Sequence, residues 1–321
     1  MEKFNSDAEA IDHFAKKYKT LTAEIAKIIV GQHNVVQSVI ISIFCDGHSL
    51  LVGVPGLAKT LLVKTIAGTL DLTFNRIQST PDLMPSDITG SEILDQSRNF
   101  KFNKGPVFAH IILADEINRT PPKTQAALLE AMQERHVTVS GQLHHLPLPF
   151  FVLATQNPIE QEGTYPLPEA QLDRFMFNIN LDYLTFDEEV QMVKNTTADR
   201  DVTVNKIMND EEIIFYQKLI RKIPIADNVL KYAVTLAAKT RPHEANVPQK
   251  ITEYVTWGAG PRASQFLVLG AKCHAAINGK YSPDIEDVKA VAHSILRHRI
   301  VRNYKAEAEG ISVEDLVNSI L

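Results

Sequence analysis

The sequence predicts an α/β domain with a parallel sheet flanked by helices, followed by a smaller helical domain. Three observations support this prediction. Short apolar strands alternate with helices up to about residue 183, which is typical of a parallel sheet covered on both faces. Strand-like segments stop after Tyr183, and helical periodicity continues from there. The chain of 321 residues is long enough for two domains, which we expect to span residues 1–185 and 186–321.

Two amphipathic helices are predicted before the first strand, within residues 8–45. The first spans residues 8–29 and carries apolar side chains at helical spacing: Ile11, Phe14, Ala15 and Tyr18. A short break at residues 30–32 separates it from the second helix, which we expect over residues 33–45.

The strands and helices of the sheet then follow in alternation. Apolar runs predict strands at residues 50–52, 111–114 and 150–154, and further strands are expected at residues 73–78 and 175–181. Helices are expected at residues 60–70 and 122–135, and the second begins with proline, which helix N-termini tolerate. Residues 186–321 are expected to contain only helices, with breaks near residues 224, 241–242, 258–261 and 282–283.

Two β-hairpins interrupt this alternation and are expected to project from the core. The first is predicted near residues 90–105 and the second near residues 136–148, where Ser140-Gly141-Gln142 forms a turn between strand-like runs. His144 and His145 are adjacent on the second hairpin, so their side chains point to opposite faces and cannot share a metal ion.

Composition narrows the classes of function. The 33 basic and 38 acidic residues give a net charge of −5, which argues against binding nucleic acid or an anionic membrane through bulk charge. Cys45 and Cys273 lie far apart in the sequence and lack metal-ligand spacing, so a disulfide framework and a zinc cluster are excluded. The two cysteines fit a reducing, cytoplasmic setting best. Residues 1–7 lack an apolar core behind a basic head, so we expect no signal peptide there, and no membrane insertion is expected because apolar runs stay well below about 20 residues.

The strongest functional motif is a phosphate-binding loop between the strand at 50–52 and the helix at 60–70: Gly53-Val54-Pro55-Gly56-Leu57-Ala58-Lys59-Thr60. The N–H groups of such a loop and the positive end of the following helix surround a polyphosphate. The lysine adds charge near the terminal phosphates, and the threonine hydroxyl ligates Mg²⁺. Because alanine tolerates positive φ poorly, we expect Ala58, where glycine is usual, to be helical or extended.

Two carboxylates, Asp115 and Glu116, follow the apolar strand at 111–114. In this class of fold, ligands bind at the edge formed by the carboxyl ends of the strands. Asp115 can hold Mg²⁺ directly or through water, and Glu116 can orient and polarise an attacking water molecule. A merely acidic loop end is the alternative, which the spacing of about 55 residues from the phosphate loop disfavours.

Three further polar residues are candidates for the same chemistry. Asn157 follows another strand and can hydrogen-bond a γ-phosphate or the water, although alone it fits an ordinary Asn-Pro turn better. The planar guanidinium of Arg174 suits the charge that develops in phosphoryl transfer, with a surface ion pair to Asp173 as the alternative. Arg262 begins a helix of the second domain, where it either reaches phosphate or stays solvated.

Other polar groups favour structural interpretations. Arg119 either meets a neighbouring subunit or forms a local ion pair. Cys273 and His274 are adjacent on a helix, so they do not face each other as a nucleophile and its base. A basic helix face is expected to be solvated or to contact a subunit rather than nucleic acid, and it consists of His293, Arg297, His298 and Arg299.

Five motifs in this order resemble the MoxR family of AAA+ ATPases, over residues 25–321. They are the phosphate-binding loop, Asp-Glu-Ile-Asn-Arg at 115–119, Ala-Thr-Gln-Asn-Pro at 154–158, Leu-Pro-Glu-Ala-Gln-Leu-Asp-Arg-Phe at 167–175 and Gly-Pro-Arg-Ala at 260–263. Alanine before the lysine is usual in this family. The resemblance implies an AAA+ P-loop sheet followed by an all-helical lid domain.

The resemblance also implies roles for single residues. The phosphate-binding loop corresponds to Walker A, and residues 115–116 correspond to Walker B. Catalytic roles are implied for three residues, namely Glu116, Asn157 as sensor 1, and Arg174 as an arginine finger that completes a neighbouring subunit's site. Further nucleotide contacts are implied for Asp115, for Arg262 as sensor 2, and for the segment beside adenine, Val30-Gly31-Gln32. The implied ligands are ATP and Mg²⁺, with the metal on Thr60 and Asp115.

The function implied is that of an ATP-hydrolysing, chaperone-like protein that remodels or matures a protein partner. Family members typically act with proteins that carry a von Willebrand factor A (VWA) domain, and they assemble as hexameric rings in which the two hairpins face the pore or a partner. Three alternatives stay open: the ATPase subunit of a metal chelatase, a nucleic-acid translocase, and a scaffold that binds ATP without hydrolysing it. The negative net charge disfavours the translocase, and the presence of both Glu116 and Arg174 disfavours the scaffold.

Overall fold

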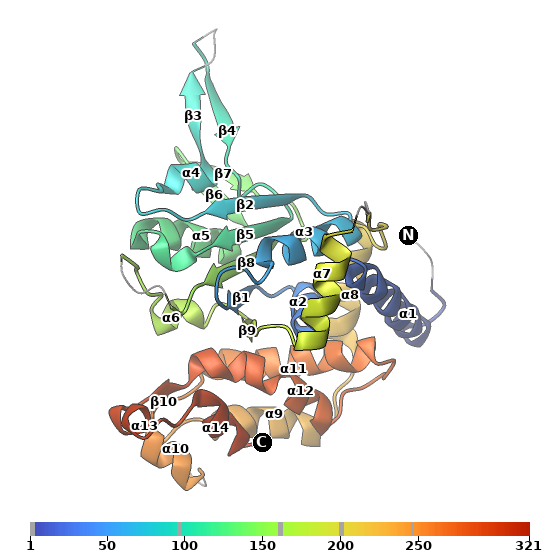
Figure 1. The fold of residues 1–321 in the computed structure, drawn as a ribbon, viewed down its shortest axis with the longest axis vertical. Coiled ribbons are helices and arrows are strands. Elements are labelled where there is room, and N and C mark those ends of the chain that lie inside the picture. The colour runs from blue at the N-terminus through green and yellow to red at the C-terminus, as the bar shows by residue number, and fades with distance from the viewer. Residues whose placement is uncertain (1–3, 95–97, 160–162, 199–201, 245–246) are drawn as a thin grey trace.

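A computed structural model describes residues 4–94, 98–159, 163–198, 202–244 and 247–321 (Figure 1). Its centre is a parallel sheet with the strand order β2-β5-β8-β1-β9. The strands are β1 (Ser49–Val52), β2 (Phe74–Gln78), β5 (Ile111–Asp115), β8 (Phe151–Gln156) and β9 (Phe177–Asn180). They agree with the predicted strands to within two residues at each end, and they confirm the predicted α/β fold.

The parallel register brings several strand ends to one edge of the sheet. Gln78 at the end of β2 pairs with Asp115 at the end of β5. Val52 at the end of β1 pairs with Gln156 of β8 and with Asn180 of β9. The loops that follow these strands therefore leave the sheet close together, at the edge where ligands bind in such folds.

Alternating strand residues face two hydrophobic clusters, one on each side of the sheet. Leu51, Leu113 and Leu153 face the cluster that includes α1 (Asp7–Ala26), α2 (His33–Phe44) and α3 (Lys59–Thr69). Their neighbours face the opposite cluster, which includes α4 (Pro85–Thr89) and α5 (Pro122–Glu134). Burial on both faces explains why β1, β5 and β8 are nearly continuous apolar runs in the sequence, whereas the outer strands β2 and β9 also carry polar residues.

The C-terminal region consists mainly of helices, and those that follow residue 226 form a lid below the sheet in Figure 1. Its elements are α7 (Phe186–Thr196), α8 (Asp210–Lys222), α9 (Asp227–Ala238), α10 (Gln249–Tyr254), α11 (Pro261–Ile277), α12 (Ile285–Leu296), η2 (Arg297–Arg299), α13 (Tyr304–Ala308) and α14 (Val313–Asn318). Within the described ranges, no helix has both the length and the apolar character needed to cross a membrane.

The expectation that strands are absent after residue 183 is wrong at one place. The strand β10 (Val255–Trp257) pairs in antiparallel fashion with β11 (Val301–Arg302) within the lid. The two strands have three and two residues, which is too short to produce the alternation that identifies a strand in a sequence.

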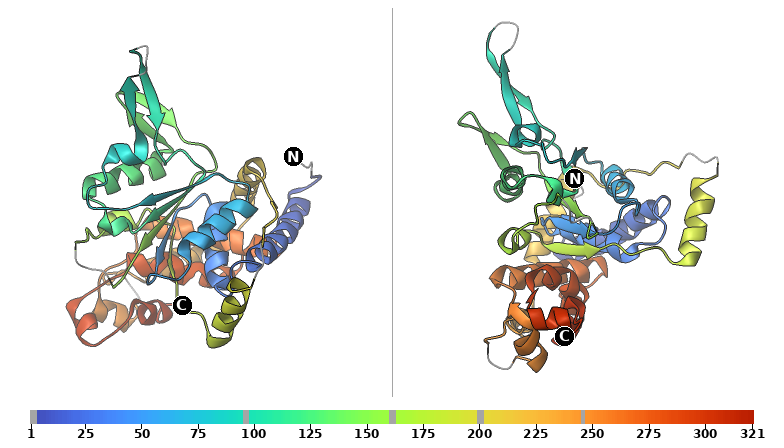
Figure 2. Two further views of the ribbon diagram at one scale, coloured as in Figure 1. Left: turned by 45° about the horizontal axis from the view of Figure 1, so that its top comes forward. Right: turned by 60° about the vertical axis from the view of Figure 1, so that its left-hand side comes forward.

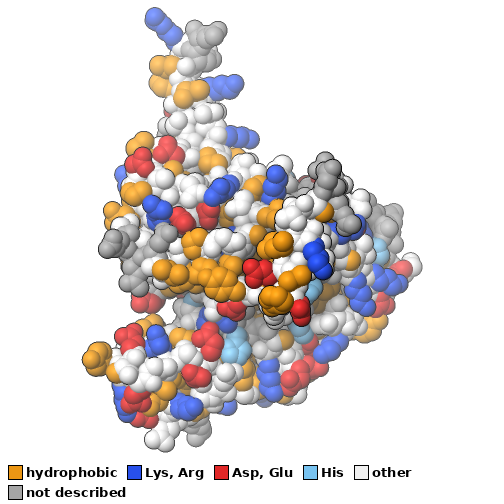
Figure 3. Space-filling view, viewed as in Figure 1, with side chains coloured by type: hydrophobic (Ala, Val, Ile, Leu, Met, Phe, Trp, Pro, Cys, Tyr) orange, Lys and Arg blue, Asp and Glu red, His pale blue; other side chains and the backbone are white. Residues whose placement is uncertain are grey.

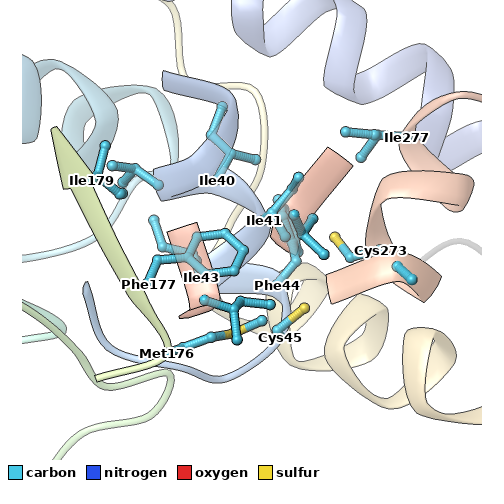
Figure 4. Packing of buried hydrophobic residues seen from close by; sticks show 14 of the residues in the cluster. Ile40, Ile41, Ile43, Phe44, Cys45, Met176, Phe177, Ile179, Cys273 and Ile277 are labelled. Carbon is cyan, nitrogen blue, oxygen red and sulfur yellow. The ribbon is translucent and has the colours of Figure 1, made fainter. Parts of the chain in front are cut away.

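The lid packs on the core through a shared hydrophobic cluster. Figure 4 shows Ile41 and Phe44 of α2 and Phe177 of β9 together with Ile277 of α11. Cys45 and Cys273, far apart in the sequence, meet in this cluster as buried free thiols. Burial and the neighbouring thiol of Cys45 raise the pKa of Cys273 well above its ordinary value.

Both predicted hairpins are present, and both project from the body of the molecule (Figures 1 and 2). The first joins β3 (Gly90–Leu94) to β4 (Phe100–Lys104), and its tip, residues 95–97, lies outside the described residues. The second joins β6 (His136–Val139) to β7 (Gln142–His145). The hairpins touch where the rings of Phe102 and His144 stack with 3.8 Å between their centroids.

Candidate nucleotide-binding site

The phosphate-binding loop lies between β1 and α3, at the carboxyl edge of the sheet. The Gly53 N–H donates to the carbonyl of Gln156 at the end of β8, with 3.3 Å between N and O. A Cβ added to Gly53 would lie 2.9 Å from the Cβ of Leu181, which follows β9, so only glycine allows this close approach. Gly56 has a φ of +87°, and nothing lies within 4 Å of its Cβ position. The loop is therefore packed at its start and open at its middle.

Ala58 adopts the left-handed conformation, with φ 54° and ψ 27°, immediately before α3. The expectation that it is helical or extended is therefore wrong. Because α3 begins at the next residue, the chain has to turn from the loop into the helix within a single residue. A left-handed conformation costs an L-residue roughly 1–2 kcal/mol, so the loop holds local strain at this position.

Lys59 is electrostatically coupled to the two predicted carboxylates. Its ammonium folds back over the loop and donates to the carbonyl of Gly53. Partial burial lowers the pKa of Lys59, while the negative charges of Asp115 and Glu116 oppose that shift. The charged residues of the first two predicted motifs therefore lie within electrostatic reach of one another.

Both carboxylate oxygens of Asp115 have partners. Its Oδ1 accepts a hydrogen bond of 2.7 Å from the Thr155 hydroxyl. Its Oδ2 lies 3.1 Å from Nε of Arg76 on β2, and Nη2 of the same guanidinium also contacts it. The guanidinium of Arg76 thus forms an ion pair with the carboxylate that is predicted to hold Mg²⁺. Carboxylate and hydroxyl oxygens suit a hard divalent cation, so Asp115 and Thr60 fit that metal chemically.

Glu116 is held by its backbone and by an ion pair. Its N–H donates to the Thr155 hydroxyl at 2.8 Å, so a single threonine positions both Asp115 and Glu116. The residue has a φ of 55°, which turns the chain sharply after β5. Its Oε2 lies 3.2 Å from Nη1 of Arg119, so the local ion pair foreseen for Arg119 is formed. Sequence reasoning missed Arg76, which belongs to no motif, and gave no role to Thr155, although Thr155 lies within the motif at residues 154–158.

Asn157 is buried directly after β8, next to the end of β1. Its Oδ1 accepts a hydrogen bond of 3.2 Å from the N–H of Ile159. The side-chain oxygen therefore closes the Asn-Pro turn that the sequence suggested. The turn and the placement at the sheet edge coexist, since the same residue follows the strand that borders the phosphate-binding loop.

A cavity of about 370 Å³ adjoins the phosphate-binding loop. Three segments line it: the break between α1 and α2, the loop with the start of α3, and the chain from the end of β9 into α7. The predicted residues among its lining are Val30, Gln32, Pro55, Gly56, Leu57 and Ala58. Its apolar walls and its place beside the loop suit a flat base and its sugar.

The segment at residues 30–32 is tied to the opposite wall of this cavity. Gln32 donates from Nε2 to the Asp182 carbonyl at 2.8 Å. Gly31 has a φ of +66°, and a Cβ there would lie 2.7 Å from Oε1 of Glu188 on α7. Sequence motifs gave no signal for the wall formed by α7 and the residues before it, which contributes Tyr183, Leu184, Glu189, Met192 and Thr196.

Arg174 and Arg262 do not line the cavity. Nη1 of Arg262 lies 3.0 Å from Oδ2 of Asp173, so Arg262 pairs with the residue beside Arg174. Within the described residues the Arg174 side chain itself makes no hydrogen bond or ion pair. The helix α6 (Glu169–Leu172), which precedes Arg174, and the cavity wall α7 lie on opposite sides of the molecule (Figures 1 and 2).

The basic segment of η2 is not a solvated face, contrary to expectation. Arg299 is buried, with a relative exposure of 5%. Burial, together with the neighbouring charges of Arg299 and Arg297, lowers the pKa of His298 well below its ordinary value. The periodicity of the sequence could not reveal this burial, because the covering chain comes from residues 173–178, more than a hundred positions earlier.

The fold and the loop define the class of the protein: a P-loop nucleotide-binding core followed by a lid, as in the AAA ATPases. A family model for the ATPase family associated with various cellular activities (AAA) matches residues 48–177. A second model, for the AAA lid domain, matches residues 249–320.

Comparison with individual proteins narrows the class. The chain is 42% identical to Chaperone MoxR1 of Mycobacterium tuberculosis, over 93% of this chain and 79% of that protein. It is 39% identical to the uncharacterised protein YeaC of Bacillus subtilis, over 92% and 91% of the two chains. The crystal structure of an ATPase candidate from Cytophaga hutchinsonii has a TM-score of 0.91 at 45% identity, over 97% and 95% of the two chains. The chain belongs to the MoxR family of AAA+ ATPases.

Proposed function

We propose that this protein hydrolyses ATP, with Mg²⁺, and uses the energy to remodel a protein partner. One observation carries the proposal: Lys59, Asp115, Glu116 and Asn157 meet at one edge of the sheet, beside an apolar cavity and an open phosphate-binding loop. Membership of a family of ATPases supports the same reaction.

The cavity and the loop divide the recognition of the nucleotide between them. The base and sugar would lie in the apolar cavity, with Gln32 and Met192 on opposite walls. The triphosphate would lie along the loop, where N–H groups and the N-terminus of α3 favour negative charge. Lys59 would leave the Gly53 carbonyl and neutralise the terminal phosphates.

Thr60 and Asp115 would hold Mg²⁺, which supplies charge neutralisation on the phosphate oxygens when bound. Asp115 is kept in place by Thr155 through Oδ1. Its Oδ2 now contacts Arg76, so the guanidinium has to release or share that oxygen when the metal arrives. Arg76 is half exposed and therefore free to turn toward solvent.

Glu116 would orient the attacking water and take up its proton. Its backbone is anchored to Thr155, so its position relative to the sheet edge is fixed. The Glu116 carboxylate is engaged in an ion pair with Arg119. This ion pair would have to break before Glu116 could accept a proton from the water. Asn157 would donate from its amide to the water or to the γ-phosphate, because its oxygen is already engaged by Ile159.

A second subunit would complete the site. Neither Arg174 nor Arg262 lines the cavity of its own chain, and Arg262 pairs with Asp173, the residue directly before Arg174. An arginine that reaches the phosphates of a neighbour stabilises the charge that develops in phosphoryl transfer. We infer a ring of identical subunits, hexameric as the family resemblance implies, in which each site uses Arg174 and Arg262 of the next subunit.

The partner is proposed to be a protein, with a VWA-domain protein as the class that the family resemblance suggests. The name of the relative Chaperone MoxR1 supports such a role. The β3–β4 hairpin displays exposed apolar side chains, among them Leu94 and Phe100, next to the basic Lys101 (Figure 3). An exposed apolar strip of this kind suits contact with another protein.

The decisive experiment replaces the proposed base. Glu116→Gln removes the carboxylate and keeps the size, so we expect ATP to bind with unchanged affinity while turnover falls at least about a hundredfold. Calorimetry with ATP and Mg²⁺ measures binding, and phosphate release measures turnover. Glu130→Gln, on the exposed face of α5, is the matched control and should behave as wild type. Normal turnover in Glu116→Gln would remove Glu116 from its role.

A further inference from the structure

The η2 segment of the lid forms hydrogen bonds with the backbone on both sides of Arg174. Arg299 donates from Nη2 to the carbonyl of Asp173 at 2.8 Å and to that of Phe175 at 2.7 Å. Its Nη1 contacts the carbonyl of Met176 at 3.3 Å. One buried guanidinium therefore binds three backbone carbonyls of the segment between α6 and β9.

Two neighbours of Arg299 extend the same contact. His298 approaches the carbonyl of Phe175, with 3.1 Å from Nε2 to the oxygen. Arg297 donates from Nη1 to the carbonyl of Asn178 at 3.4 Å. The three residues 297–299, which we call the lid clamp, thus hold the chain from Asp173 to Asn178.

The lid clamp also carries an ion pair. Nε of Arg299 lies 2.8 Å from Oδ1 of Asp173, while Arg262 pairs with Oδ2 of the same carboxylate. Burial lowers the pKa of Arg299 to about 10, so the guanidinium remains charged at neutral pH. A buried charge of this kind is stable only while its partners stay in place, which makes the contact intolerant of small shifts.

We propose that the lid clamp is a positioning device for Arg174, through which the lid sets where the arginine points. The backbone carbonyls on either side of Arg174, those of Asp173 and Phe175, are both fixed by Arg299, whereas the Arg174 side chain is left without a partner in the described residues. A movement of the lid therefore moves the backbone of Arg174, which changes the position of its guanidinium in the neighbouring subunit's site. The inference rests on the proposed role of Arg174 at that site.

The first test separates turnover from binding. Arg299→Gln leaves the phosphate-binding loop and the cavity of the same subunit intact. We therefore expect kcat to fall about tenfold to a hundredfold while KM for ATP changes less than about twofold. Arg299→Lys retains the charge and should recover part of kcat, which guards against a variant that folds poorly. Arg302→Gln is the control, since Arg302 bonds the Ile311 carbonyl within the lid and should leave kcat unchanged.

The second test mixes subunits, because a purely structural defect is not repaired in trans. Lys59→Ala subunits are expected to lose ATP hydrolysis but to supply a well-placed Arg174 to their neighbours. Adding them to Arg299→Gln subunits should restore turnover, as it should for Arg174→Ala subunits. Conversely, subunits that carry both Lys59→Ala and Arg299→Gln should fail to restore Arg174→Ala subunits, whereas Lys59→Ala with Arg302→Gln should succeed.

The outcomes distinguish this inference from the proposed function. If Arg174→Ala loses turnover but Arg299→Gln keeps wild-type kcat, or is not restored by Lys59→Ala subunits, the lid clamp does not position Arg174. If Arg174→Ala keeps full turnover, the shared site itself is wrong, and the positioning role falls with it.

Discussion

At the scale of single residues, Ala58 shows how a small departure from a motif is accommodated. The backbone keeps the left-handed conformation that a glycine adopts without cost, although the residue is alanine. The strain is tolerated because the start of α3 and the packing of Gly53 against Leu181 fix both ends of the loop.

The strain at Ala58 predicts unusual tolerance of glycine there. Ala58→Gly should change the free energy of unfolding by less than about 1 kcal/mol, because relief of strain offsets the added entropy of the unfolded chain. Ala58→Val should lower it by about 2 kcal/mol, since β-branched residues avoid positive φ. Urea unfolding measures both. The control, Ala67→Gly inside α3, should cost about 1 kcal/mol or more; an equal cost at Ala58 would contradict the strained conformation.

His48 is a buried residue whose two ring nitrogens have fixed roles. Nδ1 accepts the Val152 N–H at 3.0 Å, so Nε2 carries the proton and donates to the Met132 carbonyl at 2.9 Å. Burial, reinforced by the charge of Arg135, lowers the pKa of His48 well below its ordinary value of 6.5. The folded protein therefore requires the neutral ring.

The protein should lose stability in mild acid because of this histidine. Below about pH 6.5 the unfolded chain binds a proton that folded His48 rejects, which costs up to about 1.4 kcal/mol per pH unit. The free energy of unfolding, from urea titrations at pH 7, 6 and 5, should therefore fall with pH. His48→Gln should make the decline shallower but not flat, because the pKa of His298 is lowered in the same direction. An unchanged slope would show that His48 is not held neutral.

At the scale of secondary-structure elements, α7 has eleven residues, none of which is buried. Phe186 and Val193 are exposed, and hydrophobic side chains lie among acidic and basic ones at the place of this helix in Figure 3. Yet α7 forms one wall of the cavity through Glu189 and Met192. A helix with an apolar wall and little packing of its own should gain contacts when a nucleotide fills the cavity.

A substitution at Met192 should therefore lower the affinity for ATP more than it lowers the stability of the fold. Met192→Asp should weaken ATP binding about tenfold or more, because an apolar contact with the base is replaced by a charge. The melting temperature without nucleotide should change little, since α7 contributes no buried residue. Val193→Asp is the matched control, because Val193 lies on the same helix but outside the cavity lining. Equal losses in both variants would argue against α7 as a wall of the nucleotide site.

The elements themselves were largely predictable. The five parallel strands, the flanking helices and both hairpins were predicted because buried strands and tight turns leave continuous, local patterns. The pair β10 and β11 was missed, because strands of three and two residues leave no such pattern.

At the scale of the whole molecule, the two arginines predicted to act on phosphate, Arg174 and Arg262, lie outside the cavity of their own chain. Arg262 pairs with Asp173, and Arg174 follows α6 on the side of the molecule opposite α7. A site whose charge-stabilising groups lie elsewhere in the same chain is incomplete in a monomer. Assembly and turnover should therefore be linked.

Turnover per subunit should consequently rise with protein concentration as rings form. Over a hundredfold dilution we expect phosphate release per subunit to fall in parallel with the assembled fraction measured by analytical ultracentrifugation. Arg174→Ala should bind ATP normally yet lose at least about a hundredfold in turnover at every concentration, as for removal of an arginine finger. Constant turnover per subunit in a monomeric sample would contradict a shared site.

The sequence by itself determined the order of strands and helices, the position of the phosphate-binding loop, and the placement of Asp115, Glu116 and Asn157 after buried strands. These features are local: each depends on a run of neighbouring side chains, or on a strand followed directly by its loop.

Only the tertiary structure decided the conformation of Ala58, the wall that α7 adds to the cavity, the pairing of Arg262 with Asp173, and the burial of Arg299. In three of these the interacting groups come from distant parts of the chain, and in the fourth the ends of the loop impose the backbone. Long-range packing decides such features, because the free energy of a buried charge or a strained residue depends on neighbours that sequence order does not specify.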